Sequence, residues 1–333
     1  DGIKMGSVIN YTVNGFKRYP YSHRHAIKGN YYFATNGFEL SYKGIFPRAI
    51  GKWNFILDAV YTSPNFSVNF FGIGNETVNY DKEVGRDYNR VKIRTIKVTP
   101  SLQWNGEMGG AFLTKLAFER NQIANTPNRY VTFPNAVNAD VFNYNNFADV
   151  NAEYSYENYD NQSNPTLGIT FSLLGGYKMN LDETEQRFPY GEGALGFNYR
   201  ISSDGKLVLA TLIKSKTMFD DNYEFYQAPT VGGDMDLRGF RNQRFSGKTT
   251  FYQSTDLRFN LGKLRSGFAP MTYGFFGGFD YGRVWVKNDR SDKWHQSFGG
   301  GVWLNGVNLI TTKLSYFHST DGGRVSFGLG FGF

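Results

Sequence analysis

Apolar and polar residues alternate in segments of about ten residues, and this alternation constrains the fold more than any other feature of the sequence. At the carboxy-terminal end, Val325, Phe327, Leu329, Phe331 and Phe333 alternate with small or polar residues. Because successive side chains of a strand point to opposite faces, the pattern predicts one apolar face and one polar face. Such segments are typical of a transmembrane β-barrel, whose strands contact lipid outside and a polar lumen inside.

The same alternation recurs along the whole chain. Phe38, Leu40 and Tyr42 alternate with polar residues, and Leu257 and Phe259 do so much later in the sequence. Turn residues that tolerate positive φ separate the segments. We expect strands near residues 2–13, 23–34, 37–47, 52–63, 88–104, 110–120, 146–159, 166–179, 190–201, 205–216, 249–261, 271–286, 294–304, 308–318 and 324–333.

Composition excludes a helical membrane protein. The mean hydropathy is −0.46, and no run approaches the roughly 18 apolar residues that a spanning helix needs. The absence of cysteine excludes a disulfide scaffold and a cysteine-ligated metal site. The net charge is +7, but the lysines and arginines are scattered along strand-like segments, so we do not expect nucleic acid as a partner.

The number of strands is itself informative, because the expected segments number about fifteen and single-chain bacterial barrels have even counts. Either one strand is hidden in the pattern or the first strand lies upstream of Asp1, and we favour the second. We therefore predict an all-β fold, a closed antiparallel transmembrane β-barrel of sixteen strands. Residues 1–333 form one domain, and we expect soluble amino-terminal domains upstream of it.

Three motifs between residues 230 and 333 carry a family resemblance. Arg238, Gly239 and Phe240 close the stretch 232–240, which resembles the arginine-glycine-aromatic motif of the sixth extracellular loop in the BamA, TamA and FhaC-like superfamily of outer-membrane assembly and secretion barrels. Residues 254–259 resemble the family strand with an acid followed by an arginine, with Asp256 where glutamate is usual. Residues 279–285 resemble the next strand, which carries an aromatic residue, an aspartate, here Asp280, and a glycine.

The resemblance implies that the connection at about 217–248 is an extracellular loop that folds back into the barrel. Its arginine, Arg238, would then contact Asp256, Asp280 or both. The strand parity agrees, since both aspartates lie opposite the lipid-facing residues and so point into the lumen. A guanidinium bridges two carboxylates better than an ammonium does. Because we expect a water-filled lumen, we expect the ion pair to contribute about 1 kcal/mol or less.

Other motifs are less specific. The resemblance implies that Phe327, Leu329, Phe331 and Phe333 form the terminal strand signal that outer-membrane barrels present to their own assembly machinery. Residues 69–76 are rich in glycine but lack the lysine and following helix of a phosphate loop, so we interpret them as the start of a connection. No catalytic set stands out, and we expect no catalytic residue, no metal site and no cofactor.

The resemblance implies an integral protein of a Gram-negative outer membrane that inserts, exports or membrane-anchors protein and is not itself an enzyme. One alternative is a membrane anchor for an upstream soluble enzyme domain, such as a phosphoesterase or lipase-like domain. Another is a passive diffusion pore, although a returning loop would plug it. The expected partners are outer-membrane lipid and lipopolysaccharide, other outer-membrane or secreted proteins, and periplasmic accessory proteins.

Overall fold

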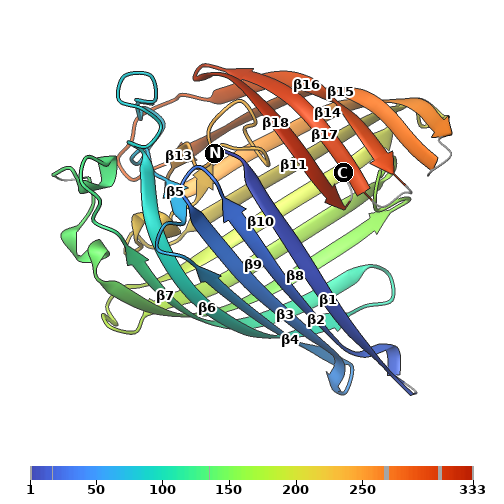
Figure 1. Cartoon of the computed structure of the whole chain (residues 1–333), viewed down its shortest axis with the longest axis horizontal. Coiled ribbons are helices and arrows are strands. Elements are labelled where there is room, and N and C mark those ends of the chain that lie inside the picture. Colours follow the sequence, from blue (N-terminus) through green and yellow to red (C-terminus); the bar gives the residue numbers. More distant parts are fainter. Residues whose placement is uncertain (1, 17, 135, 266–269, 307–309, 332–333) are drawn as a thin grey trace.

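Antiparallel strands form nearly all of the structure, a computed structural model that describes residues 2–16, 18–134, 136–265, 270–306 and 310–331 (Figure 1). Short 3-10 helices lie in the connections, at η1 (Tyr130–Thr132), η2 (Ala139–Phe142) and η3 (Phe225–Gln227). The strands are β1 (Lys4–Gly15), β2 (Arg18–Tyr32), β3 (Gly37–Ile50), β4 (Trp53–Thr62), β5 (Ser67–Asn69), β6 (Arg90–Asn105), β7 (Gly110–Ile123), β8 (Tyr144–Tyr159), β9 (Gly168–Asn180), β10 (Arg187–Arg200), β11 (Leu207–Met218), β12 (Thr230–Val231), β13 (Phe245–Ser246), β14 (Thr249–Arg265), β15 (Pro270–Trp285), β16 (His295–Gly306), β17 (Ile310–Ser319) and β18 (Gly322–Phe331).

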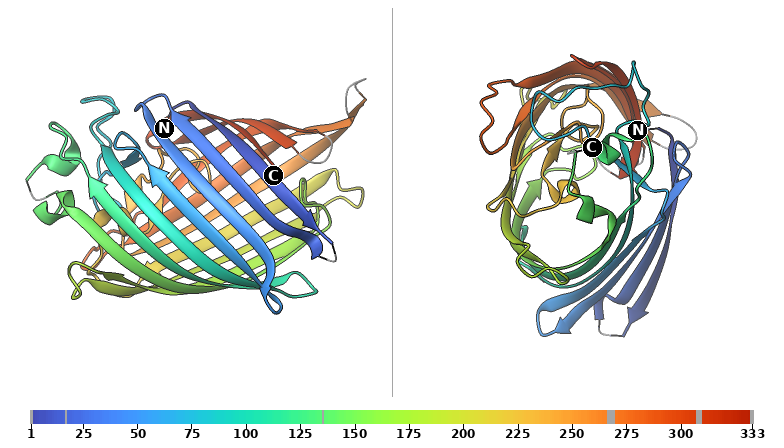
Figure 2. Two further views of the ribbon diagram at one scale, coloured as in Figure 1. Left: turned by 60° about the horizontal axis from the view of Figure 1, so that its bottom comes forward. Right: turned by 90° about the vertical axis from the view of Figure 1, so that its left-hand side faces the viewer.

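The sheet has sixteen strands, of which β5 pairs only with β6, so fifteen follow one another in chain order. These fifteen correspond to the segments expected from the alternation, and the prediction of an all-β antiparallel barrel fold is confirmed. The sheet curls into a barrel with β1 and β18 as its two ends (Figures 1 and 2). No ladder joins β1 to β18 in the described part of the chain, so closure of the sheet and a further strand upstream of Asp1 stay predictions.

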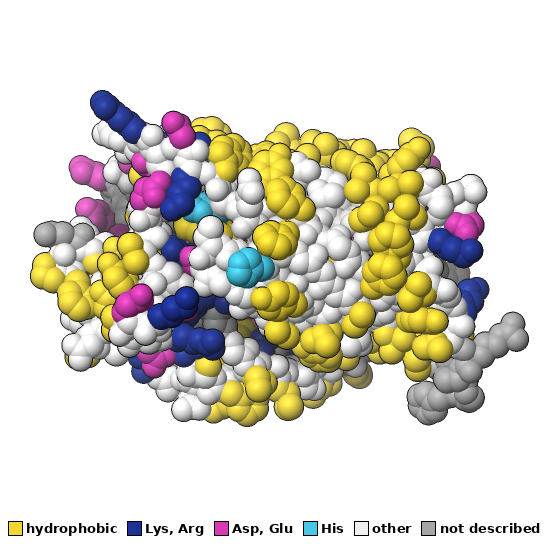
Figure 3. Space-filling view, turned by 90° about the horizontal axis from the view of Figure 1, so that it is seen from above, with side chains coloured by type: hydrophobic (Ala, Val, Ile, Leu, Met, Phe, Trp, Pro, Cys, Tyr) yellow, Lys and Arg dark blue, Asp and Glu magenta, His cyan; other side chains and the backbone are white. Residues whose placement is uncertain are grey.

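The outer face of the sheet is apolar, as the alternation predicts. Val325, Phe327 and Leu329 expose 71%, 70% and 68% of their surface on the outer face of β18. Figure 3 shows hydrophobic side chains over the middle of the molecule and most charged side chains toward its two ends. None of the described helices is long and apolar enough to cross a membrane.

The long connections lie at one end of the barrel, on the left in Figure 1, and the opposite end carries shorter ones. Residues 63–89, 124–143 and 219–248 form the three longest connections. They correspond to the widest gaps between the strands expected from the sequence. This arrangement places three large loops around a single mouth of the barrel.

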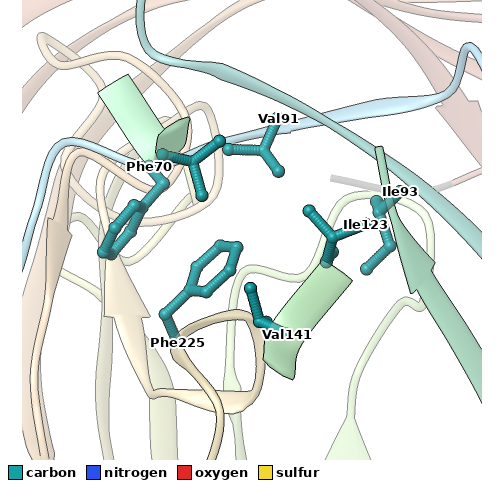
Figure 4. Close-up of a cluster of buried hydrophobic side chains, with 7 residues drawn as sticks. Phe70, Val91, Ile93, Ile123, Val141 and Phe225 are labelled. Carbon is teal, nitrogen blue, oxygen red and sulfur yellow. The ribbon is translucent and has the colours of Figure 1, made fainter. Parts of the chain in front are cut away.

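A hydrophobic cluster fills part of this mouth, and we call it the mouth cluster (Figure 4). Strands β6 and β7 contribute side chains from their inner faces, and the three long connections contribute the rest. Its buried members are Phe70, Val91, Ile93, Ile123, Val131, Val141 and Phe225. The inner surface is therefore apolar here, unlike the polar lumen expected from the alternation.

Candidate functional site

Residues 219–248, here called the inserted loop, connect β11 to β14 and lie inside the ring of strands (Figure 2). The strands β12 and β13 pair with each other and close the stem of the loop. Val231, Leu237, Phe240 and Phe245 are buried against Tyr252, Val284 and Leu212 of the barrel wall. This apolar contact, rather than charge alone, holds the loop against the inner face of β14 and β15.

Arg238 connects the inserted loop to two neighbouring strands. Its Nη1 donates to Asp256 Oδ1 on β14 at 2.7 Å. Its Nη2 donates to Asp280 Oδ1 on β15 at 2.6 Å, and its Nε donates to Asp280 Oδ2 at 3.0 Å. The backbone N–H of Arg238 also donates to Asp280 Oδ2, at 3.1 Å. The structure thus brings together the three residues that the sequence motifs had suggested.

Asp280 is the centre of this network. Its side chain has no exposed surface, and it also accepts hydrogen bonds from Ser254 Oγ at 2.7 Å and Ser297 Oγ at 2.8 Å. Buried carboxylates are stable only when their oxygens are well bonded, and both oxygens of Asp280 are. The Arg238–Asp280 pair is therefore buried more deeply than the sequence predicts, whereas Asp256 keeps 17% of its side chain exposed.

The neighbouring carboxylates stabilise the positive charge of Arg238. Burial by itself would lower the pKa of Arg238, but the hydrogen bonds and negative charges of Asp280 and Asp256 outweigh it and raise that pKa above its ordinary value. The guanidinium also lies over the ring of Phe317 on β17, 4.0 Å from the ring centroid. A planar cation can stack on an aromatic face and still donate at its edges, which an ammonium cannot do.

The two residues after Arg238 are fixed by close packing. A Cβ on Gly239 would lie 2.8 Å from the Cβ atoms of both Ser297 and Ser319, so only glycine fits against the wall here. Ser319 Oγ donates to the carbonyl oxygen of Gly239 at 2.7 Å. The Phe240 side chain is fully buried, with its ring edge-to-face against Phe245.

Two further arginines of the inserted loop were not predicted as site residues from the sequence. Arg241 forms an ion pair with Asp81 and donates to Asn69 Oδ1 at 2.8 Å. Arg244 Nε donates to Asp321 Oδ2 in the turn between β17 and β18, at 2.6 Å. Arg238, Arg241 and Arg244 recur at every third position, and this spacing of cations in a loop was the available signal.

The connection 63–89 covers the inserted loop. The Phe71 ring contacts both Arg241 and Arg244, with guanidinium carbons 5.3 and 4.7 Å from its centroid. Asn75 exchanges two hydrogen bonds with the backbone of Val284, at 2.7 and 3.0 Å. The glycine-rich stretch 69–76 thus lies within this connection, at and after the end of β5, rather than at its start, and it packs on the loop that Arg238 anchors.

The outward apolar side chains of the terminal strand lie apart from this network. Phe327 and Leu329 are on the outer face of β18, whereas Arg238 lies against the inner face of the sheet. The side chain of Phe331 and the whole of Phe333 are outside the described residues. Across the described ranges, no group of three or more histidine, aspartate or glutamate side chains could hold a metal ion. The contacts of Arg238 with Asp256 and Asp280 fix the position of the inserted loop against the barrel wall.

Comparison with known proteins gives similarity at the level of structure. No protein-family model matches the sequence, and no curated protein matches it. The structure is similar to BamA from Haemophilus ducreyi lacking POTRA domains 1–3, with a TM-score of 0.65 and 14% identity over 97% of this chain and 69% of that one.

Two CdiB structures are similar as well. For CdiB from Acinetobacter baumannii the TM-score is 0.62 and the identity 12%, over 98% of this chain and 56% of that one. For CdiB from Escherichia coli the TM-score is 0.64 and the identity 11%, over 98% of this chain and 59% of that one. The chain therefore spans little more than half the length of these CdiB chains. Its fold is that of the BamA and CdiB barrels.

Proposed function

We propose that this chain is the barrel of a Gram-negative outer-membrane protein that inserts or exports other proteins. The fold shared with BamA and CdiB supports this proposal, and the observation that carries it is the buried network of Arg238, Asp256 and Asp280. A fully bonded buried network holds a loop in one position. The inserted loop is therefore a fixed part of the lumen rather than a mobile surface segment.

The obstruction of the lumen argues against a passive pore. The inserted loop and the mouth cluster occupy one end. From the other end, the connection 160–167 reaches across to the opposite wall, where Thr311 Oγ1 donates to the Ser163 carbonyl oxygen at 3.4 Å and Arg258 Nη2 donates to the Pro165 carbonyl oxygen at 2.5 Å. A conducting pore needs a continuous water path, and these segments obstruct it.

In this proposal the partners are outer-membrane lipid and lipopolysaccharide, other outer-membrane or secreted proteins, and periplasmic accessory proteins. Soluble domains upstream of Asp1 would engage the substrate first. Anchoring of a soluble enzyme domain is the competing function. An anchor needs a folded barrel, whereas insertion or export also depends on where the inserted loop lies.

Replacement of Arg238 separates these functions. The full-length protein carrying Arg238→Ala would replace the wild type in its source bacterium, with Arg187→Ala, at an exposed position of β10, as the control. Mass spectrometry then quantifies the outer-membrane and secreted proteins. We expect specific proteins to be lost from one fraction in Arg238→Ala only. Unchanged levels in both fractions, with the variant folded in the membrane, would favour the anchor.

Single-channel recording on the purified barrel tests the pore. We expect no stable large conductance from the wild type. A persistent large open level would contradict an obstructed lumen and would support passive diffusion.

A further inference from the structure

A cavity of about 390 Å³ lies between the inserted loop and the part of the wall formed by β6 to β11. Its volume falls within the roughly 300–1,000 Å³ of small-molecule sites. Phe70 and Phe225 of the mouth cluster form its apolar edge (Figure 4), and most of the remaining lining is polar or charged. No part of the network around Arg238 lines it, so it is a separate feature of the lumen.

Three lysines and two acids line this cavity, and one lysine lacks a carboxylate. Lys97 and Lys178 both pair with Glu119, at 3.1 and 3.2 Å. Asp149 lies 3.8 Å from Lys178 Nζ and accepts a hydrogen bond from Tyr190 OH at 2.8 Å. Both acids of the lining are therefore already engaged.

Among the described residues that line the cavity, Lys216 on β11 is the lysine without a carboxylate partner. Glu192, the residue opposite it on β10, bonds instead to Lys214 at 2.5 Å. In the described residues no carboxylate lies within ion-pair distance of Lys216, whose ammonium lies 5.8 Å from the Tyr190 ring centroid. A cation that faces a partly enclosed cavity attracts an anion more strongly than one in bulk water, because the local dielectric is lower.

The same cavity is bordered by buried polar atoms that have no hydrogen-bond partner among the described residues: Tyr226 OH, Gln227 Nε2 and Asn151 Oδ1. The amide orientations are set by other bonds. Gln227 Oε1 accepts from the Glu224 backbone N–H at 2.9 Å, and Asn151 Nδ2 donates to Asp149 Oδ1 at 2.6 Å. Buried polar atoms are rarely left unpaired, so these three are candidate hydrogen-bonding partners for a bound species.

We propose that this cavity is a binding site for a small hydroxylated oxyanion, such as a sugar acid. Lys216, Gln227 and Tyr226 supply a positive charge and hydrogen-bond donors for the carboxylate. Asn151 Oδ1 supplies an acceptor for a hydroxyl group of the ligand. The inserted loop and the barrel wall each provide part of the site, so binding links the position of the loop to the wall at a place remote from Arg238.

Glucuronate is the probe for this site, titrated calorimetrically into the purified barrel in detergent at constant ionic strength. We expect saturable binding at one site. Lys216→Met should weaken it about tenfold or more, as loss of a charged hydrogen-bond partner does. Lys263→Met is the control, because Lys263 is an exposed lysine of β14 that does not line the cavity.

Tyr226→Phe gives a second variant that keeps the aromatic ring, and it should weaken binding severalfold. The protease resistance of the inserted loop serves as the check that each variant is folded. Failure of the wild type to bind glucuronate, or equal binding by the wild type and Lys216→Met, would overturn the proposal. Neither result bears on protein insertion or export, which the Arg238 variants test.

Discussion

The guanidinium of Arg238 lies face-on over the ring of Phe317, which comes from a third strand beyond the two that supply its aspartates. Desolvated cation–π contacts contribute about 2 kcal/mol. Phe317→Leu should therefore reduce the free energy of docking of the inserted loop by about that amount. The change should appear as faster proteolysis of residues 219–248. Phe298→Leu, which changes a lipid-facing ring of β16, is the control and should leave the rate unchanged.

Glycine at position 278 provides the space for Arg238. A Cβ there would lie 2.6 Å from both Arg238 Nη2 and Asp256 Oδ1. Gly278→Ala should displace the guanidinium and cost about 1–3 kcal/mol, as overpacking does. Gly277→Ala is the matched control, because the nearest atom to its Cβ would be 4.0 Å away. Equal thermal unfolding temperatures for the two variants would show that the site tolerates the extra methyl group.

Removal of Arg238 leaves a buried acid without its partner. Breaking a buried ion pair from one side costs about 3–5 kcal/mol, and undocking of the loop relieves that cost. Arg238→Ala should therefore keep a strand-rich circular dichroism spectrum while residues 232–246 become sensitive to external protease in intact outer membranes. Arg238→Lys should recover only part of the resistance, since it loses the bidentate bond to Asp280. Full resistance in the alanine variant would contradict this role.

Asp236 makes docking of the loop dependent on pH. Burial, together with a smaller effect of the charge of Asp280, raises the pKa of Asp236 to about 6, although two backbone hydrogen bonds and Lys214 oppose the shift. The docked loop binds the proton more tightly than the free loop. The contribution of Asp236 to docking is therefore fully present below the ordinary aspartate pKa of 3.8 and is lost as the pH rises through about 6.

Asp236→Asn keeps the acceptor oxygen that receives the Gly232 and Leu237 N–H groups and removes the titration. Hydrogen exchange of these two amides measures the effect. Relative to the asparagine variant, the wild type should lose protection between about pH 4 and pH 6 and no further above that range. A constant difference between the two proteins across this range would contradict the expectation.

The terminal strand should exchange its amide hydrogens faster than β14. In the described residues β18 pairs on one side only, with β17, whereas β14 pairs with both β11 and β15. Added Cβ atoms on Gly328 and Gly330 would meet no atom within 4 Å, so this strand packs thinly. Equal protection of 322–331 and 249–265 would indicate that β18 has a second partner strand.

The strands were predictable because each one carries its own alternation, as the lipid-facing residues of β18 illustrate. The contact of Arg238 with Asp256 and Asp280 was also predictable, because the family resemblance of the three motifs implies it and the parity of the two strands agrees. The partners of Arg241 and Arg244 were not. Asp81 lies 160 residues from Arg241 in the sequence, in a connection without periodicity. Burial of the network was missed for a related reason, because loop packing, not strand pattern, excludes the water.

The mouth cluster has a consequence for the order of assembly. The tilted rings of Phe70 and Phe225 contact each other at a centroid separation of 4.5 Å, although six strands of the barrel, β6 to β11, lie between them in the chain. A chain that has paired its strands only as far as β10 holds the other buried members of the cluster without Phe225. Contacts of such sequence separation form late. Until Phe225 is in place, a partly assembled barrel exposes this apolar surface. During that interval it is most prone to aggregate with other chains.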